Sequence, residues 1–590
     1  MMSTWNLDAL YTSYESPEFK QDMQMIHQAI QAMEDLATSL PDEIDTKLCH
    51  AILETLQQFQ LVSRKVGTYI SLNGSTDTTD PITVGYRDRY SALVSGAAKP
   101  ITMLQKALGR IKNLDAQCAE NPLIKEHEFF VREIQSRNRY LLNDDVEEVI
   151  SKMELNASDA WDQLQSYMTS TLEIDYDGNS MTLSSLRNLA YSPDRTVRKS
   201  AYEAEIKGYD KIKDSVSFAL NSIKGEANVI SQMRGYESVL DMTLIHSRLS
   251  QESLNAMLTS IQKYLPDFHR YLRHKAALFG HKNGLPFYDL FALLPCDQSR
   301  EYTIEEARDY LVKNFNTFSQ EISDIVNRAY DEQWIDFYPR KGKVGGAFCA
   351  NLPFLKQSRV LTNFDGSLSD VITLAHELGH AYHGTRIQQH SPLNTRYTMP
   401  VAETASTFNE TVIMNAAIRD AQSNQEKAML IESMLQDITQ VICDIYSRYL
   451  FETEVVEKRK NEFLFSKDLE QIMIEAQKKA YGQGLDHTCL HPFMWVCKGH
   501  YYNVGLNFYN FPYAFGCLFA RGLYAQFIKE GTSFVDKYNK LLTATTIKSC
   551  EDVAMMAEID ITKNDFWENS LENVKEYIDQ FIELTPIKSS

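Results

Sequence analysis

The length, composition and charge of the chain exclude several classes of protein. Its 590 residues exceed what one hydrophobic core usually supports, and 44% hydrophobic with 23% charged residues is typical of a folded chain. A formal net charge of −20 argues against general binding to nucleic acid or to an anionic membrane surface, because both would repel the chain. We therefore expect a folded protein with neither kind of partner.

The cysteines and the N-terminal sequence indicate in which cellular compartment the protein is located. Nine cysteines, an odd number, include no CxxC pair, which favours reduced thiols over a disulfide framework. The N-terminal segment lacks a basic region followed by an apolar one, and no apolar run approaches 18 residues. These features predict a cytoplasmic protein that neither crosses a membrane nor is exported.

The first part of the chain is predicted to be helical. From about Ser16 to Leu258, apolar residues recur every three or four positions with few breakers, and alternation of the strand type is scarce. Two helix starts stand out, at Ser16-Pro17-Glu18 and at Ser192-Pro193-Asp194, where a hydroxyl cap precedes a proline and an acid. This pattern predicts a series of amphipathic helices.

Glycines and prolines interrupt this pattern between Gly280 and Arg300, and we expect a junction between lobes somewhere before this segment. Thr303 and Glu306 then predict a capping box for a new helix. The segments KGKVGGAFCANLP and SRVLTNFDGS predict two short strands joined by a turn, and long helices return after Leu368. The predicted fold class is mainly α, with a small β-sheet beside the next motif.

The segment SLSDVITLAHELGHAYHGT contains the H-E-x-x-H spacing, in His376, Glu377 and His380. Residues four apart lie on one face of a helix, so the two imidazoles can converge on a single zinc ion while Glu377 stands beside it. Ser367 and Asp370 predict a capped start for this helix. Alternatively, the two histidines bind no metal and are solvated or core residues. The predicted helix and the candidate third ligand favour the metal site over this alternative.

A catalytic zinc needs a third protein ligand and one position for water. Metzincins place a third histidine six residues after the second ligand, but Arg386 stands there, so that class is excluded. We expect Glu403 as the third ligand, with His383 and His390 as competitors. Glu410, seven residues beyond Glu403 and on the same helical face, either orients a ligand histidine or is an exposed carboxylate.

The sequence resembles the thimet oligopeptidase and oligoendopeptidase F family of zinc peptidases, most closely oligoendopeptidase F. The resemblance runs through LPFYDLFALLP, GGAFCANLP, SRVLTNFDGSLSDVITLAHELGHAYH, AETASTFNE and HYYNVGLNFYNFPYAFG. It implies a helical N-terminal lobe over residues 1–200 and a catalytic domain over residues 201–590. It also implies a two-lobed body with a deep channel that admits short, unstructured oligopeptides.

The resemblance further implies that His376, His380 and Glu403 bind one zinc ion and that Glu377 is the general base. Zinc lowers the pKa of its bound water toward about 7, and Glu377 would remove the proton as the water attacks the peptide carbonyl.

In the family the corresponding C-terminal segment carries a histidine followed nine residues later by a tyrosine. This implies that His500 and Tyr509 stabilise the oxyanion together with zinc. The family's second tyrosine falls at Pro512 here, so Tyr502 or Tyr513 would take its place beside the substrate.

A glycine-containing strand is a candidate for binding the substrate's backbone. Glycines let another chain approach closely, so a peptide could add to this strand by β-augmentation, although a tight turn is equally compatible with the sequence. The residues concerned are Gly345, Gly346, Ala347 and Phe348.

Two other functions remain open at this point. A dipeptidyl carboxypeptidase or carboxypeptidase would use the same zinc site together with a cationic residue for the substrate's terminal carboxylate. A helical peptide-binding scaffold with a structural metal is disfavoured, since a structural site takes four protein ligands and has no use for Glu377. An endopeptidase acting on oligopeptides is the predicted function.

Overall fold

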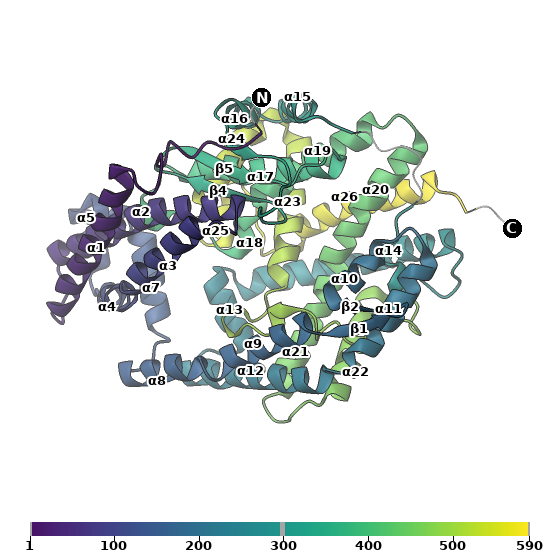
Figure 1. The fold of residues 1–590 in the computed structure, drawn as a ribbon, viewed down its shortest axis with the longest axis horizontal. Helices are drawn as coiled ribbons and strands as arrows, with labels where there is room; N and C mark the ends of the chain where they lie inside the picture. The colour runs from purple at the N-terminus through teal and green to yellow at the C-terminus, as the bar shows by residue number, and fades with distance from the viewer. Residues whose placement is uncertain (1–2, 295–300, 588–590) are drawn as a thin grey trace.

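The computed structural model describes residues 3–294 and 301–587 and is mainly helical, as predicted (Figure 1). Its first helices are α1 (Pro17–Thr38), α2 (Thr46–Thr76), α3 (Pro81–Ser95), α4 (Ala98–Gly109), α5 (Leu114–Glu120), α6 (Pro122–Glu126), α7 (Glu128–Asn138), α8 (Asp144–Glu154) and α9 (Ser158–Ser170). The Ser16 hydroxyl accepts a hydrogen bond from the Phe19 amide and caps α1, as the sequence indicated.

A short hairpin precedes the second group of helices. Its strands are β1 (Glu173–Tyr176) and β2 (Asn179–Thr182), and its turn residues Asp177 and Gly178 both have positive φ. The helices that follow are α10 (Leu183–Asn188), α11 (Arg195–Tyr209), α12 (Lys213–Arg234), α13 (Val239–Ser247), α14 (Gln251–Leu278), α15 (Ile304–Phe315) and α16 (Gln320–Asp331). This hairpin was missed by the sequence reading.

The predicted helix start at Ser192 is wrong by two residues. Asp194 is the N-cap of α11, because its carboxylate accepts a hydrogen bond from the Thr196 amide, while the Ser192 hydroxyl is used by the Asp194 amide. Pro193 therefore lies before the cap rather than in the first turn. The predicted capping box of Thr303 and Glu306 on α15 is confirmed.

The chain ends in a third group of helices. They are α17 (Leu368–Ile387), α18 (Met399–Ala402), α19 (Thr404–Asp420), α20 (Asn424–Thr439), α21 (Ile445–Lys458), α22 (Ser466–Tyr481), α23 (Phe511–Glu530), α24 (Phe534–Ala544), α25 (Cys550–Met555) and α26 (Asn564–Leu584). No helix in residues 3–294 and 301–587 has the length and apolar character that crossing a bilayer requires.

A small sheet lies directly before α17, as predicted. Its strands, in the order β3-β5-β4, are β3 (Ile335–Asp336), β5 (Gln357–Leu361) and β4 (Phe348–Leu352). Strand β4 runs antiparallel to β5, with Cys349 opposite Val360, while β3 runs parallel to β5. Figure 1 places β4 and β5 beside α17. In the described part of the chain, β4 is an edge strand.

Buried hydrophobic residues form two clusters. One extends from Trp5 to Ile134 and includes Leu352 and Leu361 of the sheet, while the other runs from Leu172 through the C-terminal helices. The sheet therefore contributes to both cores. The division into residues 1–200 and 201–590 stays a prediction, and its boundary falls within α11.

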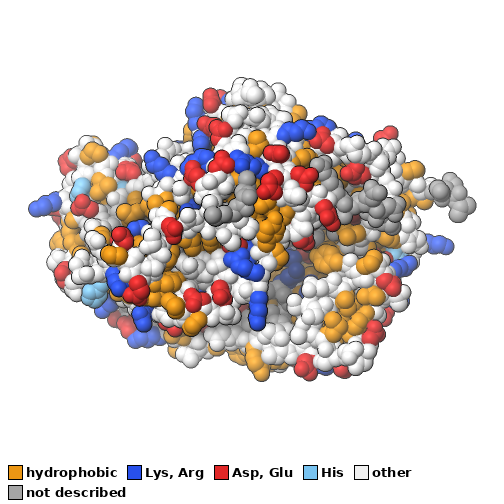
Figure 2. Space-filling model, turned by 45° about the horizontal axis from the view of Figure 1, so that its top comes forward, with side chains coloured by type: hydrophobic (Ala, Val, Ile, Leu, Met, Phe, Trp, Pro, Cys, Tyr) orange, Lys and Arg blue, Asp and Glu red, His pale blue; other side chains and the backbone are white. Residues whose placement is uncertain are grey.

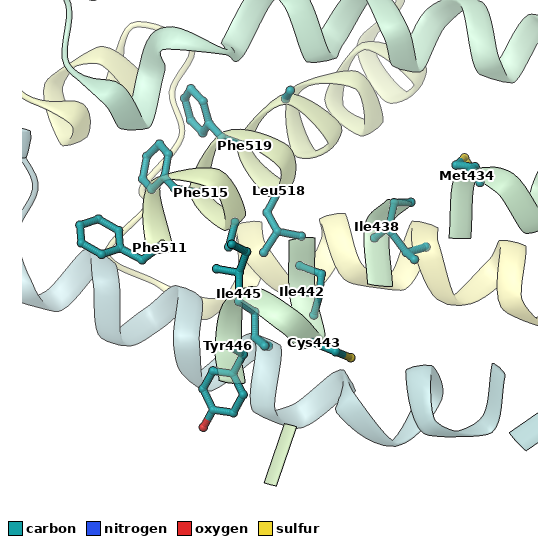
Figure 3. Packing of buried hydrophobic residues seen from close by; sticks show 14 of the residues in the cluster. Met434, Ile438, Ile442, Cys443, Ile445, Tyr446, Phe511, Phe515, Leu518 and Phe519 are labelled. Carbon is teal, nitrogen blue, oxygen red and sulfur yellow. The ribbon is translucent and has the colours of Figure 1, made fainter. Parts of the chain in front are cut away.

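Helix α23 is buried in the larger core on more than one side. Figure 3 shows its Leu518 beside Ile442 of the π-helical segment Gln440–Asp444, while its Phe515 packs against Trp567 of α26. The labelled residues are Phe511, Phe515, Leu518, Phe519, Met434, Ile438, Ile442, Cys443, Ile445 and Tyr446. This packing fixes α23, whose N-terminal end leads into the site described below.

A cavity of about 640 Å³ separates part of the N-terminal helices from the rest of the molecule. Its walls come from α4 and α7 on one side and from α13, residues 393–399 and residues 505–512 on the other. The space-filling view in Figure 2 shows a hollow near the middle of one face, with Lys and Arg side chains beside it. The two-lobed arrangement predicted from the resemblance is thus present.

Candidate metal centre and catalytic site

Helix α17 holds the two histidines of the motif. Its start is fixed by a capping box, in which the Ser367 hydroxyl accepts from the Asp370 amide and the Asp370 carboxylate accepts from the Ser367 amide. One turn separates His376 from His380, and their ring centroids lie 4.9 Å apart. Both imidazoles therefore project from one side of the helix.

Glu403 completes a group of three potential ligands. Its Oε2 lies 3.3 Å from Nε2 of His376 and 3.2 Å from Nε2 of His380. One ligand atom from each residue lies within 4.8 Å of the others, and no other such group occurs among the residues that the structure describes. Burial alone would raise the pKa of the Glu403 carboxyl, but hydrogen bonds from the two histidines outweigh it and lower that pKa far below its usual range.

Glu403 and Glu410 both contact His376, although they do not share one continuous helix. Glu403 is the junction between α18 and α19, where the helix is interrupted, and Glu410 lies on α19. Oε1 of Glu410 is 2.6 Å from Nδ1 of His376, the ring nitrogen opposite the one that faces Glu403. Glu410 is therefore placed to fix the tautomer of His376, with Nε2 free to bind a metal.

The two competing histidines point elsewhere. His383 is buried, stacks on Tyr397 and has its Nε2 2.8 Å from the Thr545 hydroxyl; burial lowers its pKa to about 3. Nε2 of His390 lies 2.8 Å from the backbone carbonyl of Thr543. Neither joins the group formed by the two motif histidines and Glu403.

Glu377 lines a second cavity, of about 450 Å³, beside the metal ligands. The walls of this cavity are Gly346, Ala347, Thr362, Asn363, Asp370, Thr373, His376, Glu377 and Glu410. Only 6% of Glu377 is exposed, and burial raises the pKa of its carboxyl. A small polar reactant in this cavity would therefore meet a carboxylate suited to accept a proton.

The approach of α17 to α19 depends on Gly379, the residue before the second histidine. A Cβ at this position would lie 2.6 Å from both the Ala405 carbonyl oxygen and the Ser406 Cα, distances that van der Waals radii do not allow. These backbone atoms belong to α19, just after Glu403. The missing side chain thus lets the helix with the histidines lie directly against the segment with the carboxylate.

We expect Gly379→Ala to force these two helices apart and to weaken metal binding. The overpacking should cost about 1–3 kcal/mol in the free energy of unfolding, measured by chemical denaturation, and metal content should fall. Gly85→Ala is the matched control, because a Cβ on this α3 residue meets no atom within 4 Å. Equal stability and metal content in both variants would contradict this account of the packing.

Three side chains from the C-terminal segment gather into an aromatic group. The His500 ring centroid lies 4.9 Å from that of Tyr509 and 6.0 Å from that of Tyr513, and the tyrosine rings are 5.4 Å apart. Burial and the neighbouring Tyr509 raise the pKa of Tyr513, and the charge of Glu403 adds to this rise. The helix that carries Tyr513 also lies against Glu403, because a Cβ at Gly516 of α23 would be 3.4 Å from Cβ of Glu403.

One predicted substrate contact needs correction. Tyr502 is fully buried and donates its hydroxyl to the Trp495 carbonyl at 2.9 Å, so it is not available to a substrate. The ring of Phe348, the first residue of β4, packs against Trp5, and backbone pairing of a substrate at this residue stays a prediction. The predicted strand also begins later than expected, because Gly345 and Gly346 form a bend before β4 in which Gly346 has a φ of 77°.

The bend before β4 nevertheless reaches the site. The Asn363 side-chain amide donates to the Gly346 carbonyl at 2.8 Å, and Gly346 and Ala347 line the cavity that contains Glu377. Thr362, Asn363 and Thr373 also line this cavity and were missed by the sequence reading. The only signal for the first two was their place within the segment SRVLTNFDGS, directly after the residues that form β5.

Two imidazoles and a carboxylate around one point, with a second carboxylate in the adjoining cavity, define a metal-dependent hydrolase. Comparison with known families identifies the family of hydrolase. Residues 188–573 match the model of peptidase family M3, and residues 111–173 match that of oligopeptidase F. Because the first match covers more than half of the chain, this protein belongs to peptidase family M3. It is a metalloendopeptidase.

Similar proteins support this assignment, and a solved structure shares the fold. Oligopeptidase PepF of Bacillus subtilis is 25% identical over 98% of this chain and 87% of its own length. Group B oligopeptidase PepB of Streptococcus agalactiae is 24% identical over 85% of this chain and 84% of its own. The structure of oligoendopeptidase F from Enterococcus faecium superposes with a TM-score of 0.71, at 18% identity, over 96% of this chain and 98% of its own.

Proposed function

We propose that the protein is a zinc-dependent endopeptidase that hydrolyses internal bonds of short, unstructured oligopeptides. The observation that carries this proposal is the convergence of His376, His380 and Glu403 on one point while Glu377 lines the cavity beside them. A metal held on one side of a cavity, with a buried base on another, suits hydrolysis of a carbonyl compound.

The donor set fits one zinc ion. Two imidazole nitrogens and one carboxylate oxygen are the ligands of catalytic zinc sites that keep a position open for water or substrate. Glu410 supports this fit, because a carboxylate on the far nitrogen of a ligand histidine fixes the ring and raises its basicity. When bound, zinc would act as a Lewis acid that lowers the pKa of water and polarises the scissile carbonyl.

The proposed chemistry assigns a proton-transfer role to Glu377. Its buried carboxylate would take a proton from the attacking water and pass it to the leaving nitrogen of the cleaved bond. His500 and Tyr509 would donate hydrogen bonds to the oxygen that becomes negative, and Tyr513 stands beside them as a further donor. Tyr513 lies on the first turn of α23, the helix whose Gly516 faces Glu403.

The protein would bind the substrate's backbone, independently of the substrate's amino-acid sequence. Strand β4 is an edge strand in the described part of the chain, and Gly346 and Ala347 lead from it into the cavity with Glu377. An extended peptide could hydrogen-bond to this edge by β-augmentation. Such pairing suits an enzyme that cleaves many short peptides, because the contacts are to atoms that every residue has.

One experiment tests the function as a whole. The purified protein is incubated with a mixed peptide library, with and without a metal chelator, and the products are identified by mass spectrometry. We expect internal cleavage of short peptides that stops when the chelator is added. Products trimmed only by one or two residues from the carboxyl end would instead identify the carboxypeptidase or dipeptidyl carboxypeptidase alternative.

We also propose that the enzyme acts in the cytoplasm. The eight cysteines in the described part of the chain are free thiols, a state that reducing compartments maintain. Fractionation of cells followed by immunoblotting would test this location, and recovery of the protein outside the cytoplasm would contradict it.

A further inference from the structure

A buried ion pair lies beneath the segment that carries Tyr509. Nζ of Lys224 on α12 is 2.7 Å from Oε1 of Glu452 on α21, and neither residue is more than 1% exposed. Removing two charges from water is costly, and such pairs often contribute little to net stability. The burial of the Lys224–Glu452 pair therefore suggests a role other than stabilising the fold.

The pair bonds to residues on both sides of Tyr509. Oε1 of Glu452 accepts from the backbone amide of Phe508 at 2.9 Å, and its Oε2 accepts from the side-chain amide of Asn510 at 2.8 Å. Nζ of Lys224 donates to Oδ1 of Asn507 at 2.9 Å. Three residues within two positions of Tyr509 are thus held by one charged pair, while the ring of Tyr509 lies against that of His500.

The backbone at this place needs such support. Phe508 has a φ of 55°, the left-handed region, which costs a residue with a side chain about 1–2 kcal/mol. Asn510 accepts from the Phe511 amide at the start of α23, so the segment also sets where that helix begins. A strained turn persists only where its surroundings hold it, and Glu452 supplies an acceptor to the amide of the strained residue itself.

We propose that Lys224 and Glu452 are positioning residues for Tyr509, holding its ring against His500 in the geometry that the reaction requires. This inference rests on the proposed role of Tyr509 in stabilising the oxyanion. The pair does not contact the three metal ligands in any described hydrogen bond or ion pair. Loss of the Lys224–Glu452 pair should therefore leave metal binding intact, and it should lower kcat rather than raise KM.

The first test observes Tyr509 directly. 3-Fluorotyrosine is placed at position 509 of the full chain, and its ¹⁹F resonance is recorded with and without Glu452→Gln. We expect the resonance to broaden or split in the variant, because Phe508 and Asn510 lose their charged acceptor. An unchanged resonance would overturn the proposal.

The matched control is a second buried pair of the same kind. Nζ of Lys275 is 2.6 Å from Oε1 of Glu432, both residues are at most 1% exposed, and their described bonds go to residues other than 507–510. We expect Glu432→Gln to leave the ¹⁹F resonance of residue 509 unchanged. Equal changes in the two variants would reveal a general loss of packing and would also overturn the proposal.

The second test uses kinetics. Glu452→Gln should lower kcat by about 10²-fold, since small displacements of a catalytic group cost that much. In a Tyr509→Phe background, Glu452→Gln should lower kcat by a further factor of less than about two. The reason is that the hydroxyl it positions is already absent. Fully additive losses would overturn the positioning role.

Two further outcomes are distinguishable. If Tyr509→Phe alone keeps full kcat, the proposed oxyanion role of Tyr509 fails, and the ¹⁹F result alone decides whether the pair holds residue 509. If Glu452→Gln does not fold, the double variant Lys224→Gln with Glu452→Gln replaces it in both tests, because it leaves no unpaired buried charge.

Discussion

Glu377→Gln is expected to lower kcat by about 10²–10⁴-fold while the bound metal is retained. Glutamine keeps the shape of the side chain but cannot accept the proton of the attacking water. The metal should stay because its proposed ligands are His376, His380 and Glu403. Initial rates on a quenched peptide with both ends blocked, together with metal analysis of the same sample, measure the two quantities.

The matched control for this loss is Glu475→Gln on α22, whose carboxylate is exposed and bonds only to Lys478 and Gln471 among the described contacts. We expect full activity in that variant. Full activity in Glu377→Gln would show that another group takes the proton, and the proposed mechanism would be wrong.

His380→Ala is expected to abolish both metal binding and peptidase activity. Removing one of three ligands should lower metal affinity by more than the 10–100-fold that loss of an outer hydrogen-bond partner typically costs. After dialysis against metal-free buffer, elemental analysis should find about one equivalent in the unmodified protein and only background in the variant.

His390→Ala controls for the loss of a histidine as such. This histidine was a candidate ligand by sequence, but its Nε2 faces the Thr543 carbonyl instead. We expect the variant to keep its metal. Metal loss in His390→Ala, or retention in His380→Ala, would contradict the assigned ligand set.

The sequence predicted those parts of the structure that depend on local spacing. The four-residue interval between His376 and His380 fixes their common face on any helix, and the Ser367 capping box fixes where that helix begins. The carboxylate beside the two histidines was also predictable, because a catalytic zinc needs a third ligand and the segment after the motif offers Glu403. The interruption of the helix at Glu403 was not, since it depends on how α18 packs against α23.

Features decided by tertiary contacts were missed. Tyr502 stands in an aromatic-rich segment, and its burial depends on a hydrogen bond to the Trp495 carbonyl that no local pattern encodes. Lys224 and Glu452 are of residue types that usually face solvent, and they are 228 positions apart. By contrast, the β1–β2 hairpin had a local signal, the Asp177-Gly178 pair, which favours a two-residue turn.

The backbone contact at Gly379 has a consequence for motion. Since α17 and α19 touch through main-chain atoms, neither helix can slide past the other without a clash, and their ligands move as one rigid unit. A movement that widens the larger cavity would therefore come from its own walls, on α4, α7 or residues 505–512, and not from α17 and α19. Entry and exit of substrate would thus be separated mechanically from the atoms that hold the ion.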